Sequence, residues 1–340
     1  MNKELIFIVD FNNRFSSKWA AKPYRSGMDK ALLKSEFEKL GIDIQFMPYY
    51  DIDFRDKSFF ENKVFLYTSS EDKNLYYKSY IEDIILGLEM IGAEIIPSYK
   101  YLRAHHNKTF MEIMRDVSDF DNKDIKSKYF GTFEDFKKNA KNLDYPLVLK
   151  SAFGATSKTV TLINSVKQGL KKTKQFSRSK SLFYDIRDIL RRIRHKGYIM
   201  ESTHRKKFIV QNLIAGMDRD YKILVFGKKY FVLERRVKKN DFRASGSGLI
   251  AYTKELPEGM LDYAKQFFEY QNLPFFAMDV AFNGTGFTLI EFQALYFGTH
   301  TLDRAPYYFV KKNDTWHCVE GKSIVEKELA TSVVAYLQKK

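Results

Sequence analysis

The segment "MDVAFNGTGFTLIEFQ", residues 278–293, constrains the fold more than any other stretch because it predicts a β-hairpin with a defined register. Apolar residues alternate along both arms, as they do in strands that bury one face. Matching the apolar faces requires a loop of odd length, and residues 284–286 with a left-handed Gly286 satisfy this requirement. In that register Asp279 lies directly opposite Glu291.

The predicted opposition of two carboxylates is unfavourable and therefore informative. A shared Mg²⁺ ion would remove the repulsion, since Mg²⁺ takes one or two carboxylates and completes its shell with phosphate oxygens. Gln293, opposite Ala277, would lie on the same face, together with Leu289. The alternative is an ordinary solvated face of a sheet. Without a metal, replacing Asp279 or Glu291 with its amide is expected to leave the apo protein as stable or slightly more stable.

Composition describes a folded and strongly basic protein. Hydrophobic residues make up 44% of the 340 residues and aromatic residues 16%, enough to bury the core of two domains or of one large domain. The net charge of +15 predicts an anionic partner such as a nucleotide, a nucleic acid, a polyanion or a membrane surface. The single cysteine, Cys318, excludes an internal disulfide. No apolar run has the length of a signal-peptide core or a membrane span, so we expect a cytoplasmic protein without a membrane partner.

The pattern of elements changes near residue 100. Before that point strands such as "LIFIVDF" alternate with helices such as "LYYKSYIEDIILGLEMIG", which predicts a parallel sheet with helices packed on it. After it, "FIVQNLI", "YKILVFG" and "YFVLERRV" predict antiparallel strands within an α+β arrangement. Residues 167–196 are strongly basic. They form either a solvated helix face or a surface for an acidic acceptor or a bound polymer.

Three cations stand beside segments that suit phosphate binding. Lys150 ends an apolar strand in "PLVLKSAFGATSKTV" and leads into a loop of small residues, whose N–H groups can approach an anion closely. Lys108 lies near the start of a helix, and Arg243 precedes a Ser-Gly loop, where an arginine can bind a phosphate or a developing oxyanion. The structural alternatives are a flexible hairpin loop, a surface lysine and a charged surface loop.

The order of these stretches resembles the ATP-grasp superfamily. The resemblance covers about residues 105–300 and rests on five motifs that occur in the family's order. They are the strand-end lysine with its small loop, "FIVQNLI", "DRDYK", the Phe-Arg before a Ser-Gly loop, and Asp279 with Glu291-x-Gln293. The sequence is most similar to carboxylate–amine ligases, such as ribosomal-protein glutamate ligase and glutathione synthetase.

The resemblance implies an α/β domain followed by two α+β subdomains. A parallel-sheet pre-ATP-grasp domain would span 1–103, and the ATP-grasp domain would span 104–340. Within the latter, the first subdomain would comprise 104–210 and carry the basic stretch, and the second would comprise 211–340 and carry the hairpin.

The resemblance also implies roles for individual residues. Lys150 and Arg243 would be catalytic, with Arg243 steadying an acyl phosphate. Asp279, Glu291 and Gln293 would hold Mg²⁺, with Mn²⁺ as an alternative ion. The resemblance implies four kinds of ATP contact: two lysines on the phosphates, a loop that closes over them, a hinge beside adenine, and an Asp-x-Lys pair near the nucleotide. In that order the residues are Lys108 and Lys150; Gly154, Thr156 and Ser157; Gln211, Asn212, Leu213 and Ile214; and Asp220 and Lys222.

The chain departs from the family pattern at several positions. Asn212 stands where the family usually has an acid, which puts the adenine contact in doubt. Thr159 replaces a glycine and is expected to stiffen the phosphate loop. Gln293 replaces an asparagine, and "QALYFGTHT" replaces the usual Asn-x-x-Pro-Gly ending, so the pocket beyond the metal is expected to be unusual.

The implied activity is ATP-dependent ligation of a carboxylate to an amine through an acyl phosphate. Its partners would be carboxylate and amine substrates, such as an amino acid and an acidic peptide or polymer. Two alternatives remain open: an ATP-grasp kinase acting on an anionic or sugar acceptor, and a polyanion- or nucleic-acid-binding protein that is not an enzyme. Nucleic acid is the less favoured partner, and a homo-oligomer is left open.

Overall fold

The structure is a computed structural model that describes residues 4–340 except 122–123, 155–158, 180 and 240. The chain divides into two compact units. The large unit comprises Met1–His105 and Met217–Lys340, and the small unit comprises His106–Gly216. The expected domain boundaries at 103/104 and 210/211 stay predictions.

The N-terminal part of the large unit is the predicted parallel sheet with its helices. Its strands have the order β2-β1-β3-β4 and all pair in parallel. Every residue of β1 after Glu4 is buried, as expected for a parallel strand covered on both faces. The elements are β1 (Glu4–Val9), α1 (Lys30–Glu38), β2 (Ile44–Pro48), η1 (Tyr49–Asp51), η2 (Lys57–Phe60), β3 (Lys63–Tyr67), η3 (Lys73–Leu75), α2 (Tyr76–Met90), β4 (Glu94–Ile96) and α3 (Tyr99–Ala104).

The C-terminal part of the large unit is an antiparallel sheet of order β13-β12-β9-β10-β14-β15, with β11 paired to β10. Helix α8 packs on one face, where the Phe267 ring contacts those of Phe276 and Phe292. The elements are β9 (Arg219–Phe226), β10 (Lys229–Arg236), β11 (Ile250–Ala251), α8 (Met260–Gln271), β12 (Phe275–Phe282), β13 (Phe287–Gln293), α9 (His300–Arg304), β14 (Tyr307–Lys312), β15 (Thr315–Glu320) and α10 (Val325–Leu337).

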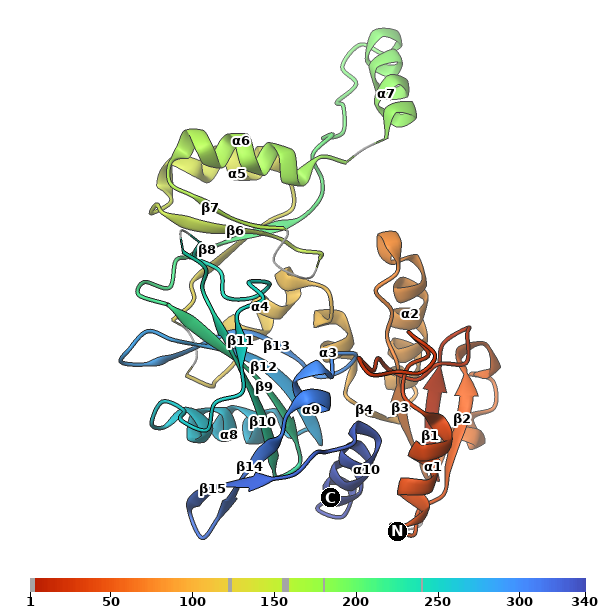
Figure 1. Ribbon diagram of the computed structural model, residues 1–340. Coiled ribbons are helices and arrows are strands. Elements are labelled where there is room, and N and C mark those ends of the chain that lie inside the picture. Colours follow the sequence, from red (N-terminus) through yellow and green to blue (C-terminus); the bar gives the residue numbers. More distant parts are fainter. Residues whose placement is uncertain (1–3, 122–123, 155–158, 180, 240) are drawn as a thin grey trace. The chain divides into compact units, whose positions relative to one another are not determined.

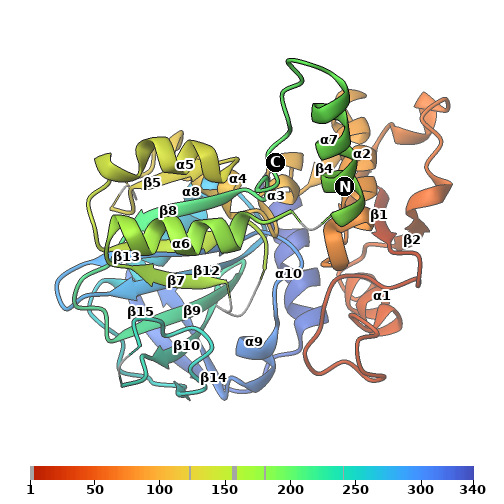
Figure 2. The ribbon, with the colours of Figure 1, turned by 90° about the horizontal axis from the view of Figure 1, so that it is seen from above.

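One hydrophobic core joins these two sheets. It contains Phe7 of β1, Phe37 of α1, Leu224 of β9 and Val333 of α10. Helix α10 lies beside α1 in both views (Figures 1 and 2). Residues 217–340 therefore belong to the same unit as the N-terminal sheet.

The small unit is an antiparallel sheet of order β5-β8-β6-β7 covered by α5 and α6 (Figure 1). The basic stretch forms α6 and α7. The elements are α4 (Lys108–Asp116), β5 (Ser127–Phe130), α5 (Phe133–Asn139), η4 (Ala140–Asn142), β6 (Leu147–Ser151), β7 (Val160–Ile163), α6 (Val166–Ser177), α7 (Leu182–Arg194) and β8 (Phe208–Asn212). In the part of the chain that the structure describes, no helix has the length and apolar character needed to cross a bilayer.

The register of the β12–β13 hairpin is confirmed at its polar end. Asp279 pairs with Glu291, and Ala277 pairs with Gln293. The predicted loop is wrong, because the strands end at Phe282 and Phe287 and leave a loop of even length, Asn283–Gly286.

A β-bulge reconciles the loop with the register. The left-handed glycine is Gly284, at φ +96°, and not Gly286. The Asn283 side chain fixes the loop by accepting the N–H of Thr285 at 3.0 Å and that of Gly286 at 2.9 Å. The pairing then shifts at Ile290, so that Leu289 lies opposite Val280 and is buried, instead of sharing the face of Glu291.

Candidate active site

One face of the antiparallel sheet gathers the charged residues predicted on separate strands. Lys222 of β9 lies opposite Asp279 of β12, and Asp279 in turn lies opposite Glu291 of β13. Asp220, two residues before Lys222, lies opposite Arg235 of β10. We call the set Asp220, Lys222, Arg235, Asp279, Glu291 and Gln293 the charged face.

Arg235 is the residue of the charged face that sequence reasoning missed. Its Nε donates to Asp220 Oδ1 at 2.5 Å, and its Nη2 lies 2.8 Å from Asp279 Oδ2. The signal was present in the sequence. A two-residue turn at 227–228 pairs residue 220 with residue 235, which brings the arginine beside the acids.

The cations keep Asp279 ionised although its side chain is only 15% exposed. Burial opposes the charge, but attraction by Arg235 and Lys222 lowers the pKa of Asp279 to about 2. The Lys222 ammonium lies 3.5 Å from its carboxylate. Burial raises the pKa of Asp220 to about 6. Arg235 opposes this rise, but it also contacts Asp279. The expected stability of Asp279→Asn is thereby corrected: the amide removes two attractions, so the apo protein should lose stability.

The donor set of the hairpin fits a magnesium ion that arrives with phosphate. Asp279, Glu291 and Gln293 offer two carboxylates and an amide carbonyl, all hard oxygen donors. Glu291 and Gln293 are only partly buried and lie on the edge strand of the sheet. Among the described residues no group of three or more His, Cys, Asp or Glu could hold a metal ion by itself, so an ion here would also need the Gln293 carbonyl, water or phosphate as ligands. The residues therefore suit Mg²⁺, which keeps water and phosphate ligands, better than an ion fully enclosed by protein.

In the small unit, Lys108 reaches the small-residue loop that follows Lys150. Its Nζ donates to the Gly154 carbonyl at 2.7 Å, and its backbone N–H donates to Ala152 at 2.9 Å. The Gly154 N–H donates to His106 Nε2 at 3.1 Å. Two lysine motifs predicted independently are thus brought to one loop.

The ends of this loop are partly described. Gly154 has φ +113°, a region that favours glycine, and a Cβ there would lie 3.0 Å from the Thr159 hydroxyl. Lys150 is partly buried near the end of β6. Thr156 and Ser157 lie outside the described residues.

The residues predicted to form a hinge lie at the end of β8, and two of them use their side chains inside the small unit. Gln211 is buried and donates to Ser127 Oγ at 2.8 Å, which donates in turn to Glu112 at 2.8 Å. Asn212 accepts the Lys126 N–H at 2.7 Å and donates to the Asp124 carbonyl at 3.0 Å. Leu213 and Ile214, which follow β8, are partly buried. Glu112, paired with Arg115 at 3.0 Å, was also missed, because its burial arises only in the folded unit.

Arg243 lies in the loop that follows β10 and is held by Asp241. Two guanidinium nitrogens contact the two carboxylate oxygens at 2.9 Å, which lowers the pKa of Asp241 to about 2. The loop is tied to the sheet where the Arg236 N–H donates to Leu249 at 2.9 Å.

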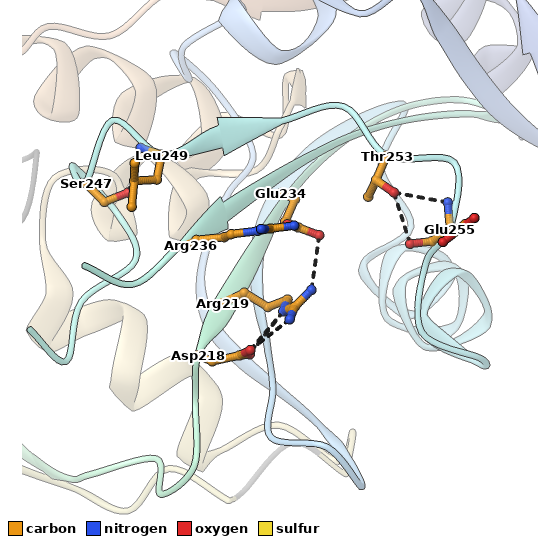
Figure 3. Close-up of polar contacts among 8 residues, drawn as sticks. All are labelled: Asp218, Arg219, Glu234, Arg236, Ser247, Leu249, Thr253 and Glu255. Carbon is orange, nitrogen blue, oxygen red and sulfur yellow. Dashed lines mark hydrogen bonds and ion pairs between the residues drawn. The ribbon is translucent and has the colours of Figure 1, made fainter. Parts of the chain in front are cut away.

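The opposite face of the sheet anchors the same strands. Figure 3 shows Arg219 between Asp218 and Glu234, with Arg236 against Glu234. These contacts fix the strand ends from which Asp220 and Arg235 project to the other side.

A second polar cluster lies at the carboxyl edge of the parallel sheet, where ligands often bind in α/β folds. Asp10 follows β1 and accepts the Nε–H of Arg14 at 2.8 Å. Ser69 follows β3 and lies 2.9 Å from Nδ1 of His105, which is 4% exposed. The His105 ring meets that of Tyr296, three residues beyond Gln293, edge-on at 5.6 Å. We call Asp10, Arg14, Ser69, His105 and Tyr296 the edge cluster.

Comparison with solved structures confirms the fold. A RiPP-associated ATP-grasp ligase from Chryseobacterium gregarium, in complex with ADP and a leader and core peptide, matches with a TM-score of 0.54 at 13% identity, over 99% of this chain and 97% of that one. D-cycloserine synthetase DcsG matches with a TM-score of 0.53 at 11% identity, over 98% and 99%. A RimK domain ATP-grasp protein from Sphaerobacter thermophilus matches with a TM-score of 0.51 at 12% identity, over 97% and 99%.

The chain therefore has the ATP-grasp fold, as the resemblance implied. No protein-family profile matches the sequence, and no curated protein matches it.

Arg235→Met should show how much the charged face depends on its shared cation. The substitution leaves the buried Asp220 and the largely buried Asp279 without their arginine, so the free energy of unfolding at pH 7 should fall by ~3–5 kcal/mol. Without the arginine the pKa of Asp220, which burial already raises, should rise further, and that of Asp279 should rise as well. The loss should therefore shrink at pH 5, where protonation removes charge from the folded state.

Arg236→Met is the matched control, because its side chain is 62% exposed on the same strand. Denaturant unfolding at both pH values compares the two variants. Equal losses for the two variants, or a loss from Arg235→Met that does not change with pH, would contradict the role given to Arg235.

Proposed function

We propose that the protein is an ATP-dependent ligase that joins a carboxylate to an amine. The observation that carries the proposal is the charged face, where three predicted metal ligands and the predicted Asp-x-Lys pair lie on paired strands of one sheet. The ATP-grasp fold supports it, because two of the similar structures are named as a ligase and a synthetase.

The proposed reaction has two steps. A carboxylate oxygen of the acid attacks the γ-phosphorus of ATP, and the bond to the bridging oxygen of ADP breaks. An amine then attacks the acyl carbon, the C–O bond to phosphate breaks, and amide, phosphate and a proton are released. Catalysis in such a reaction comes mainly from positioning and from neutralising charge on the phosphoryl group.

The chain offers residues for each of these tasks. Asp279, Glu291 and Gln293 would hold a Mg²⁺ ion, which neutralises phosphate charge when bound. Lys108, which contacts the small-residue loop, and Lys150, which precedes it, would bring positive charge to the phosphates.

We assign the remaining nucleotide contacts from the hydrogen bonds that the predicted residues already make. The side chains of Gln211 and Asn212 are hydrogen-bonded inside the small unit. Contact with an adenine edge therefore falls to the backbone of Leu213 and Ile214. Arg243, oriented by Asp241, would steady the acyl phosphate through its charge.

The edge cluster is our candidate for the acceptor-binding region. It includes Tyr296, which lies three residues beyond the end of the β12–β13 hairpin and packs against His105. Arg14 offers a cation that can bind an anion, and His105 offers a hydrogen-bonding ring. An amino acid or a peptide is the proposed class of acceptor. A cytoplasmic location, where ATP is plentiful, is part of the same proposal.

A screen of ADP formation tests the function directly. The protein would be incubated with Mg²⁺-ATP and pools of amino acids and other carboxylates. We expect ADP release above background only when a carboxylate and an amine are both present. A phosphorylated acceptor without amide would instead support the kinase alternative, and the absence of any stimulation would count against an ATP-using enzyme.

Lys150→Ala should abolish ATP turnover while the fold survives, because a strand-end ammonium beside a small-residue loop is placed to meet phosphate. A fall of ~100-fold or more in kcat is expected. Lys141→Ala, an exposed lysine in the same unit, serves as the control and should behave like the wild type. Near-normal ADP production by folded Lys150→Ala would remove this lysine from the site.

Variants of the hairpin should separate stability from nucleotide binding. Glu291→Gln should keep or raise the apo Tm, since it relieves repulsion from Asp279, yet lose the extra stabilisation from Mg²⁺-ATP. Asp279→Asn should lose that stabilisation and also melt earlier, because Arg235 and Lys222 lose their counter-charge. Gln293→Ala should weaken the effect more mildly, since a neutral carbonyl contributes less.

Thermal melts of the three variants with and without Mg²⁺-ATP provide the measurement. An undiminished Mg²⁺-ATP shift in Glu291→Gln would mean that the opposed acids are a solvated face.

Arg14→Met should raise the KM of the acceptor about tenfold and leave the KM of ATP unchanged, because the guanidinium belongs to the edge cluster and not to the nucleotide contacts. Arg55→Met is the control, since Arg55 also pairs with a neighbouring aspartate but is 90% exposed. Steady-state kinetics with the acceptor found in the screen decide the question. An unchanged acceptor KM would place acceptor binding elsewhere.

A further inference from the structure

Helix α7 exposes an unusual amount of apolar surface. No residue of Leu182–Arg194, all of which the structure describes, is buried. Its large apolar side chains have exposed fractions of 46% to 78%, and they are Leu182, Phe183, Ile186, Ile189, Leu190 and Ile193. In Figures 1 and 2 the helix stands clear of the sheet of the small unit and of α5 and α6.

The apolar side chains form one stripe. Leu182, Ile186, Ile189 and Ile193 recur at spacings of four, three and four residues, which places them on one side of a helix. Phe183 and Leu190 widen the stripe along one border. A surface helix normally buries such a stripe, and an isolated helix of this length is marginal in water. The stripe therefore calls for a partner.

Arginines border the stripe on both sides. At 100° per residue, Arg187 and Arg194 lie next to Phe183, and Arg192 lies near the opposite border. The two acids of the helix already have cationic or hydroxyl partners. Asp185 pairs with Arg178 at 2.9 Å, and Asp188 accepts the Tyr198 hydroxyl at 3.0 Å. The charge available at the stripe is therefore positive.

The chain segments that precede and follow α7 are hydrogen-bonded within the small unit. The Ser179 N–H donates to Thr203 at 2.8 Å, and the Lys206 N–H donates to Ser177 at 3.0 Å. Ser177, the last residue of α6, is fully buried. The stripe is thus carried on an anchored segment and is not part of a free chain end.

We propose that α7 docks on an anionic phospholipid surface. The stripe would enter the boundary between headgroups and acyl chains, and the flanking arginines would contact lipid phosphates. A single helix presents a convex ridge, which suits a deformable lipid surface. A docked peptide would have to supply the entire apolar counterpart of that ridge.

The proposal revises the prediction that a membrane is not a partner. That prediction rested on the absence of an apolar run long enough to span a bilayer, and an interfacial helix does not need one. The sequence left the basic stretch as either a solvated helix face or a surface for an acidic acceptor or a bound polymer, and both interpretations rested on its charge alone. The apolar stripe between the arginines changes the favoured partner, and this inference does not depend on the proposed ligase activity.

Co-sedimentation of the full-length protein with lipid vesicles tests the proposal. Vesicles of phosphatidylcholine would be compared with vesicles that also contain phosphatidylglycerol. We expect binding to the anionic vesicles to be ~10-fold tighter or more, and to weaken with added salt. Failure of the wild-type protein to bind anionic vesicles at low salt would overturn the proposal.

Two variants separate the stripe from the charge. Ile186→Asn with Ile193→Asn should lose vesicle binding by ~10-fold or more, because it interrupts the stripe. Arg187→Gln with Arg192→Gln and Arg194→Gln should bind anionic and neutral vesicles alike. Lys137→Gln with Lys138→Gln and Lys141→Gln removes the same charge from exposed positions of the same unit and should bind like the wild type.

Both variants should keep the wild-type Tm and ADP formation in solution, since none of the α7 residues that they change is buried. Unchanged binding by the stripe variant would overturn the proposal. So would binding of a soluble acidic amphipathic peptide through Ile186 and Ile193 with no vesicle binding, which would assign the stripe to a peptide partner.

Discussion

The guanidinium of Arg235 holds the charged face together, because it contacts both Asp220 and Asp279 within one sheet. Without it, the carboxylates of Asp220 and Asp279 would lie on one face of the sheet beside Glu291, with Lys222 as the remaining cation near Asp279. With it, Asp279 stays ionised and fixed in orientation, and an ionised, oriented carboxylate is what a metal ligand must be. The arrangement of β9, β10, β12 and β13 into a candidate nucleotide site thus depends chiefly on Arg235, because it contacts both acids, whereas Lys222 contacts only Asp279.

The β12–β13 hairpin contains two pairings that need different registers. Its far end must bury Leu289 with Val280, and its near end must keep Glu291 across from Asp279. A regular ladder that ends in a loop of even length cannot satisfy both. The bulge at Ile290 satisfies them by shifting the pairing by one residue between the core and the polar face. The same irregularity re-aims the edge strand where Glu291 and Gln293 would meet a ligand.

Alternation of apolar residues was sufficient to predict the parallel sheet and the antiparallel strands, because both depend on local periodicity. The predicted pairing of Asp279 with Glu291 is present only because the bulge at Ile290 offsets the longer loop. The loop was mispredicted since the Asn283 side chain, which favours the longer turn, acts through hydrogen bonds that periodicity does not show. Arg235 was missed because its role appears only when β9 and β10 are placed in register. His105 and Tyr296 meet through tertiary contacts, which one sequence does not reveal. The stripe of α7 was visible in the spacing of Ile186, Ile189 and Ile193, but the high charge of the surrounding residues predicts a solvated helix face equally well.

The central claim is that a carboxylate is activated by phosphoryl transfer from ATP. The most direct test follows oxygen-18 from the labelled carboxylate of the acceptor acid into the products, with phosphorus NMR as the readout. The account predicts that the amide forms together with phosphate that carries one labelled oxygen, because the attacking oxygen leaves with the phosphorus. Unlabelled phosphate, or a stable phosphorylated acceptor with no amide, would contradict it.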